Sequence, residues 1–328
     1  MVRTESSALE MSVPIHRDPR SNYVKRLNSA FRQGHLNVFV GAGISQEAGF
    51  PGWEAFNQAL MRGYLMSDIG SAGPAAMLAS SSIEPTATEL YGALGRDAVA
   101  DFVYRAVGKQ FGFLLASVLY GGRGIDELPL KSVHHQIASL AQRARLFTLN
   151  FDPLLECALC RKFPKKNWVD FRSPKSDGNP LTGKYKVEHL HGWIDPDGKM
   201  SPDVVLTESH YLELTENSRA RANKILKNML AGRNTTLILG MSLADPNFRR
   251  VLYFLHKQRR SSRERIYVVT RQAKPAIDHY AQRHWVSRGL RLLFVEQHDE
   301  IPGLLRDIQA IDHASTFECD GDEREVNV

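Results

Sequence analysis

Six short runs of apolar residues are spread along this chain of 328 residues, and several of them stop at glycine or at a polar residue. Runs this short that end in this way are typical of strands buried in a parallel sheet. We expect strands at residues 36–40, 144–149, 185–190, 235–240, 265–270 and 290–296.

Apolar residues at helical spacing lie between these runs, as at Val24, Leu27 and Phe31. Helices are predicted over 23–33 and 53–65, and residues 66–135 carry a mostly helical pattern broken by glycines. Strands that alternate with helices predict an α/β fold, here a Rossmann-like, mainly parallel six-stranded sheet flanked by helices, with a helical insert at 66–135. Ligands bind at the carboxyl ends of the strands in such sheets, so residues that follow each strand are candidates for a site.

Polar ends frame the chain. We interpret residues 1–20 as a lead-in, 21–311 as one domain that contains the insert, and 312–328 as an acidic tail. No apolar segment is long enough for a signal core or a membrane span. Three cysteines, Cys157, Cys160 and Cys319, are too few for a disulfide framework. These features predict a soluble cytoplasmic protein with no membrane partner.

The charge is basic overall, with a formal net charge of +6 and a sequence pI of about 9.2. Lysine and arginine cluster at 161–166, 219–227 and 249–265. Such clusters serve nucleic acid, an acidic partner or a phosphate-rich ligand, or they are simply solvated helix faces. Aromatic residues are not interleaved with them, so a nucleic-acid partner is not directly indicated.

The first candidate motif is GAGISQEAGFPGW at residues 41–53, directly after the first predicted strand. Glycines let a backbone approach a pyrophosphate closely, and free N–H groups after them can bind its oxygens. Gln46 occupies the third glycine position of the usual G-x-G-x-x-G pattern, so an ordinary tight turn is the alternative.

The second motif, TLNFDP, follows the second predicted strand. Asn150 and Asp152 point to the same side if the chain stays extended, so both would face a ligand. Asp152 followed by Pro153 is also a good start for a helix, but helix capping does not explain Asn150.

Two further strand ends carry candidate groups. The third motif is EHLHG, whose two histidines alternate along the strand but have no third metal ligand spaced nearby, and we interpret His189 as structural. The fourth is GMSLADPN at 240–247, where Asp245 is interpreted as a cap of the following helix.

The four motifs together resemble the sirtuin (silent information regulator 2) family, whose members carry similar GAGIS…AG-[IF]-P, T-x-N-x-D, H-G and G-x-S-L strings in this order. The resemblance implies an NAD⁺-binding catalytic domain in which Asn150, Asp152 and His191 are catalytic. It also implies NAD⁺ contacts by Gly41, Ala42, Gly43, Ile44, Ser45, Gly49, Pro51, Trp53, Gly240 and Ser242.

Departures from the family indicate a particular branch. Sirtuin deacylases carry two C-x-x-C pairs on a zinc module, whereas Cys157 and Cys160 have no partner pair, so no zinc or other metal is expected. The DPNFR string at 245–249 is similar to the bacterial branch used in antiphage defence. That resemblance implies an NAD⁺ hydrolase that releases nicotinamide and ADP-ribose and acts as an abortive-infection effector.

Other functions stay open. The same residues would serve an ADP-ribosyltransferase or a protein deacylase, because the acceptor is chosen by the surrounding groove. A non-catalytic subunit that senses NAD⁺ or a nucleotide is a further alternative. Control of a toxic hydrolase leads us to expect a homo-oligomer, or a partner sensor or ATPase protein.

Overall fold

A six-stranded sheet forms the centre of the molecule in a computed structural model, which describes residues 20–70, 82–95, 98–163, 186–217, 220–258 and 265–310. The strand order is β3-β2-β1-β4-β5-β6, and every pairing is parallel. The predicted α/β class with a Rossmann-like sheet is confirmed. The predicted lead-in apart from Arg20, the acidic tail and Cys319 lie outside the described residues.

The strands occupy the predicted runs with small shifts at their ends. They are β1 (Leu36–Val40), β2 (Ala144–Thr148), β3 (Val187–His189), β4 (Thr235–Leu239), β5 (Ile266–Arg271) and β6 (Leu290–Val295). Alternate residues of each strand face opposite sides of a sheet, so Val38 and Val40 pack with one helical layer and Phe39 packs with the other. Burial on both faces explains why these strands read as continuous apolar runs.

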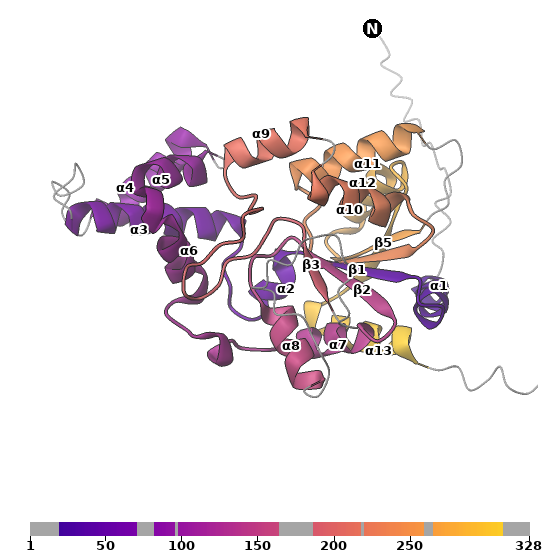
Figure 1. Cartoon of the computed structure of the whole chain (residues 1–328). Helices are drawn as coiled ribbons and strands as arrows, with labels where there is room; N and C mark the ends of the chain where they lie inside the picture. Colours follow the sequence, from indigo (N-terminus) through magenta and orange to yellow (C-terminus); the bar gives the residue numbers. More distant parts are fainter. Residues whose placement is uncertain are drawn as a thin grey trace, which may run out of the picture.

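Helices cover both faces of the sheet (Figure 1). One layer contains α1 (Arg20–Arg32), α7 (Ser132–Leu140), α8 (Leu154–Lys162) and α13 (Ile301–Gln309). The other contains α10 (Arg221–Ala231), α11 (Pro246–Gln258) and α12 (Pro275–Val286). Within the described residues, no helix is both long enough and apolar enough to cross a bilayer.

Beside the sheet lies a group of helices with its own apolar core (Figure 1). It comprises α3 (Trp53–Gly70), α4 (Ile83–Leu94), α5 (Val99–Val107) and α6 (Phe111–Tyr120). Helices α4 to α6 fall inside the predicted insert at 66–135. The short helix α2 (Ala42–Gln46) follows β1, and α9 (Glu208–Glu216) contacts both α5 and α11. Thus α9 connects the inserted helices to the layer that covers the sheet.

The two central strands end in glycine turns that touch each other. The N–H of Gly43 donates to the carbonyl of Gly240 at 2.8 Å, and a Cβ on Gly43 would lie 2.9 Å from the Cα of Gly240. Gly240 has a φ of +61°, and its own Cβ would lie 2.6 Å from the nitrogen of Ile44. Only glycines permit this approach, so the two turns form one backbone unit at the carboxyl edge of the sheet.

Replacement of Gly240 by alanine tests this contact. Gly240→Ala should lower the free energy of unfolding by about 2–4 kcal/mol, because a left-handed alanine costs about 1–2 kcal/mol and the clash with Ile44 adds to it. Gly289→Ala is the matched control, since Gly289 has a φ of +86° with nothing within 4 Å. Urea unfolding measures both, and equal losses in the two variants would contradict the role given to the glycine contact.

Candidate active site

A cavity of about 740 Å³ lies at the carboxyl edge of the sheet, where the turns after β1 and β4 meet. Strand order reverses between these two strands, and open α/β sheets bind ligands at such a point. Residues after five of the strands line the cavity, together with Glu208, Tyr211, Leu212 and Thr215 of α9. The cavity is therefore the candidate site.

A directed hydrogen-bond chain forms one wall. Asn150 Nδ2 donates to the carbonyl of Gly41 at 3.1 Å and to Ser45 Oγ at 2.7 Å, and Ser45 Oγ donates to Asp152 Oδ2 at 2.7 Å. The Gly41 carbonyl can only accept, so it fixes which end of the Asn150 amide is the nitrogen. Asn150 lines the cavity, and no hydrogen bond is recorded for its Oδ1 in the described part of the chain. That oxygen is thus available as an acceptor.

Asp152 is buried and serves two purposes. Its Oδ1 accepts the N–H of Leu154 at 3.2 Å, which caps the start of α8, while its Oδ2 accepts from Ser45. Burial raises the pKa of Asp152, although the hydrogen bonds from Ser45 and Leu154 oppose that rise. The same carboxylate therefore caps the start of α8 and lines the cavity.

His191 lies two residues after the end of β3 and is buried beside the cavity. Its Nε2 is 3.7 Å from Asp245 Oδ2, and its ring packs edge-on against Tyr211. Burial lowers the pKa of His191, and the Asp245 carboxylate only partly offsets this. The imidazole is consequently neutral near pH 7, which leaves it able to accept a proton.

Asp245 is held by contacts from two elements. Its Oδ1 accepts the N–H of Phe248 at 2.6 Å, as expected for the cap of α11, and its Oδ2 accepts from the hydroxyl of Tyr211 at 3.1 Å. Leu243, two residues earlier, has a φ of +59°, a left-handed conformation that costs about 1–2 kcal/mol for a non-glycine residue. The Leu243 side chain is buried and its carbonyl accepts from Arg249 at 2.7 Å, so this turn is firmly fixed.

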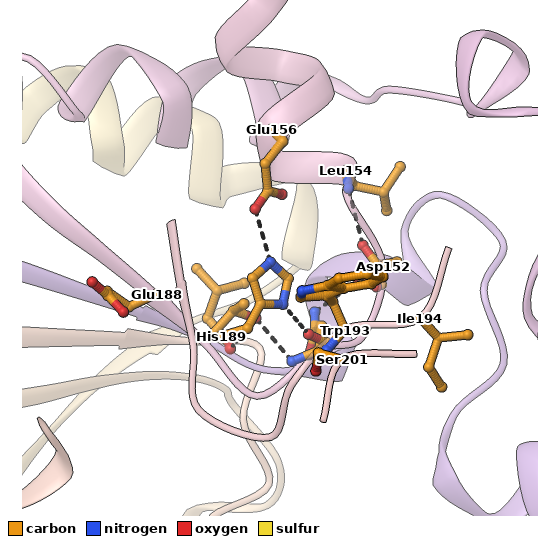
Figure 2. A network of polar contacts seen from close by, with 12 residues as sticks. Asp152, Leu154, Glu156, Glu188, His189, Trp193, Ile194 and Ser201 are labelled. Atoms are coloured by element: carbon orange, nitrogen blue, oxygen red, sulfur yellow. Dashed lines mark hydrogen bonds and ion pairs between the residues drawn. The ribbon is translucent and has the colours of Figure 1, made fainter. Parts of the chain in front are cut away.

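Behind the cavity wall, His189 bonds to two other elements (Figure 2). Its Nδ1 is 2.7 Å from the carbonyl oxygen of Asn150, and its Nε2 is 2.8 Å from Glu156 Oε1 on α8. Burial alone would lower the pKa of His189, but the charge and hydrogen bond of Glu156 and the Asn150 carbonyl outweigh it, so that the pKa is raised. Within the described residues, His189 belongs to no group of three or more potential metal ligands.

The predicted NAD⁺-contact residues mostly line the cavity. Those that do are Gly41, Ala42, Gly43, Ser45, Pro51, Trp53, Gly240 and Ser242. Ile44 instead packs into the core of the sheet, and Gly49 is not among the lining residues. The N–H groups of Gly41, Gly43 and Ile44 are bonded within the fold, so the free amides expected at this turn are not found at these three positions.

The cysteine pair on α8 shows no ligand-like character. Cys157 and Cys160 are free thiols, and burial raises the pKa of Cys157 to about 12. No group of three potential metal ligands occurs in the part of the chain that the structure describes.

Three important residues escaped the sequence analysis as parts of the site: Tyr211, Asp245 and Glu156. Tyr211 is on α9, far from the motifs in sequence, and Asp245 was interpreted only as a cap. Glu156 lies four residues after Asp152, in the first turn of α8, a spacing that brings residues close together when a helix begins. That spacing was the available signal for Glu156, whereas nothing local marks Tyr211.

Comparison with known proteins gives a family match within the chain. Residues 144–293 match the family described as a SIR2-like domain. This range includes the motifs around Asn150, His191 and Gly240, while the glycine turn at 41–53 precedes it. The chain is also similar to the protein named NAD(+) hydrolase ThsA of Enterococcus faecium, with 27% identity over 233 residues. The similarity covers 70% of this chain but only 41% of that protein.

Solved structures with a similar arrangement include two Sir2 proteins. One, described in a study of the mechanism and regulation of Sir2 enzymes, has 14% identity and a TM-score of 0.42, covering 89% of this chain and 97% of its own. The other, a Sir2 homologue in complex with NAD, has 13% identity and a TM-score of 0.47, covering 87% and 93%.

Replacement of Asp152 tests its buried charge. Because burial raises the pKa of Asp152, the ionised carboxylate lowers stability, and stability is lost as the pH rises through the folded-state pKa. Asn at 152 can accept from the Leu154 N–H and donate to Ser45. Asp152→Asn should therefore raise the urea midpoint at pH 7.5, with a gain that shrinks toward about pH 4, where the carboxyl becomes protonated in both states.

The control for this comparison is Asp307→Asn, since Asp307 is exposed on α13. It should show no pH-dependent gain. A midpoint for Asp152→Asn that lies below that of the wild type at every pH would show that the charged form of Asp152 stabilises the fold.

Proposed function

We propose that this chain, in which residues 144–293 match a SIR2-like domain, is an NAD⁺ hydrolase that breaks the bond between nicotinamide and ribose. One observation carries the proposal: a directed chain from Asn150 through Ser45 to Asp152 and a neutral, buried His191 face the same cavity. Cleavage of this bond places positive charge on the ribose, and a carboxylate and fixed dipoles stabilise such a centre.

The lining residues support one orientation of NAD⁺ along the cavity. Its nicotinamide end would lie by Asn150, Asp152 and His191, and its pyrophosphate would pass the joined turns at Gly41–Ser45 and Gly240–Ser242. Val269, Thr270, Arg271 and His298 line the remaining part of the cavity, where the adenosine half would lie. The amides of Gly41, Gly43 and Ile44 are bonded within the fold, and the Ser45 hydroxyl already donates to Asp152. The Ser242 hydroxyl and the Arg271 side chain line the cavity and are among the groups that could meet phosphate and ribose oxygens.

In the proposed reaction, water accepts the ADP-ribosyl group. The bond from ribose C1′ to the nicotinamide nitrogen breaks, and its electrons leave with neutral nicotinamide. Asn150 Oδ1 accepts a hydrogen bond from the attacking water, Asp152 supplies negative charge from behind Ser45, and His191 accepts the proton that the water loses. The products are nicotinamide, ADP-ribose and a proton.

The biological setting that we propose is antiphage defence. The similar protein of Enterococcus faecium is named an NAD(+) hydrolase, and this chain spans 41% of its length. Depletion of NAD⁺ would stop an infected cell, as in an abortive-infection effector. Such an activity needs restraint, so we include a homo-oligomer, or a sensor or ATPase partner, in the proposal. The free cysteines fit a reducing cytoplasm.

Assay of the purified chain with NAD⁺ tests the proposal. Wild-type protein should release nicotinamide and ADP-ribose, measured by chromatography, and Asn150→Ala and His191→Ala should each lower kcat by about 100-fold or more. His279→Ala, on the exposed face of α12, is the matched control and should retain wild-type activity.

Other outcomes separate the alternatives. Transfer of labelled ADP-ribose to protein would identify an ADP-ribosyltransferase, and NAD⁺-dependent loss of an acyl group from a lysine peptide would identify a deacylase. Binding of NAD⁺ without turnover at any protein concentration would favour a sensing subunit, while no binding would contradict the proposal as a whole.

The pH dependence of kcat tests the role of His191. Because burial lowers its pKa, activity should rise with pH through an apparent pKa below that of free histidine and be level near pH 7. The Asp245 carboxylate raises the pKa of His191, so Asp245→Asn should move the acid limb to lower pH. Asparagine can still cap α11. An acid limb that stays in place, or moves to higher pH, would exclude His191 as the titrating base.

A further inference from the structure

The buried imidazole of His189 joins three elements behind the candidate site (Figure 2). It belongs to β3, where it pairs in register with Thr148 of β2. Its Nδ1 reaches the main-chain carbonyl of Asn150 in the turn between β2 and α8, and its Nε2 reaches Glu156 in the first turns of α8. Both side chains are about 95% buried.

The Asn150 carbonyl determines which ring nitrogen of His189 donates a hydrogen bond. The Asn150 carbonyl can only accept, so Nδ1 carries a proton and donates. Nε2 and Glu156 Oε1 then share a proton, as an imidazolium with a carboxylate or as their neutral forms. The carboxyl groups that face His189 are those of Glu156 and Asp152, and both favour the charged ring.

We propose that His189 is a positioning residue that orients Asn150 for the reaction, with Glu156 as its anchor. This inference rests on the proposed NAD⁺ hydrolase activity. His189 does not line the cavity, so it acts through Asn150 rather than on the substrate.

Asn150 is then held from two sides. Its side-chain amide donates to Gly41 and Ser45, and its main-chain carbonyl accepts from His189. Thr148 Oγ1 accepts the N–H of Asn150 at 2.9 Å, which completes the constraint on the peptide. Displacement of a reacting group by about 1 Å can lower the reaction rate by about 100-fold. Loss of the bond between His189 and the Asn150 carbonyl should therefore lower the rate.

Two substitutions separate the two contacts of the ring. An asparagine amide nitrogen takes nearly the place of histidine Nδ1, whereas a glutamine amide nitrogen takes nearly the place of Nε2. His189→Asn therefore keeps the bond to the Asn150 carbonyl and loses Glu156. His189→Gln keeps the bond to Glu156 and loses Asn150.

Steady-state kinetics at a temperature where each variant is folded should distinguish these contacts. We expect His189→Gln to lower kcat by about 10–100-fold with KM changed by less than about threefold, and His189→Asn to stay within about fivefold of wild type. Glu156→Gln should also stay within about fivefold, since its amide can donate to Nε2 of a neutral ring that still binds Asn150. Equal kcat values for His189→Asn and His189→Gln would overturn the inference.

A buried Glu156 without its partner could unfold His189→Asn, because Glu156 Oε2 already has no hydrogen bond. The double variant His189→Asn with Glu156→Gln removes that charge and keeps the donor to Asn150. It should recover stability and retain kcat within about tenfold of wild type. Recovered stability with activity as low as that of His189→Gln would contradict the positioning role.

The NMR signal of the Asn150 side chain tests the inference without a measurement of catalysis. The side-chain amide signal of Asn150 in a nitrogen-15 NMR spectrum can be assigned by its loss in Asn150→Asp. It should shift or broaden in His189→Gln and stay close to its wild-type position in His189→Asn. An unchanged signal in both would overturn the inference even if wild-type protein has no hydrolase activity, and a changed signal with no hydrolysis would contradict the proposed function alone.

Discussion

The contact between the glycine turns after β1 and β4 is the constraint on which the site depends. The N–H of Gly43 bonds to the carbonyl of Gly240, with no room for a side chain between them. This contact sets where the neighbouring Gly41 carbonyl lies, and that carbonyl fixes the amide of Asn150. Ser45 and Asp152 follow in the same chain of hydrogen bonds. A backbone contact thereby determines the orientation of side chains from the segments that follow two different strands.

Burial acts in opposite directions on the two ionisable groups of the site. It raises the pKa of Asp152 and lowers that of His191, so both groups are pushed toward their neutral forms. Asp152 and Asp245 are also placed at the N-terminal ends of α8 and α11, where main-chain N–H groups stabilise negative charge. Helix capping is thus compatible with the proposed function, because each cap holds its carboxylate at the cavity.

Local patterns were sufficient for most of the fold. The apolar runs located all six strands, since strands buried on both faces read as continuous apolar segments. Their ends were less certain: β2 stops at Thr148, and the next residue, Leu149, instead bonds to the carbonyl of Val40. The order of the strands could not be derived, because parallel pairing joins segments far apart in the chain, such as Leu36 with Thr235. No local periodicity records which distant strand is the neighbour.

For the site too, local patterns predicted some residues, whereas others depend on contacts between distant segments. Motifs at strand ends predicted Asn150, Asp152 and His191 as candidates, and all three line one cavity because each follows a strand that ends at the same edge of the sheet. Tyr211 could not be found in this way, since it lies on α9, far from Asp245 in the sequence, and contacts Asp245 only through the tertiary fold. His189 shows a different limit. Sequence alone favoured a structural role for it. In the structure its ring bonds to the main chain of Asn150, whose side chain the proposed reaction uses. A buried histidine therefore becomes informative only when its two partners are known.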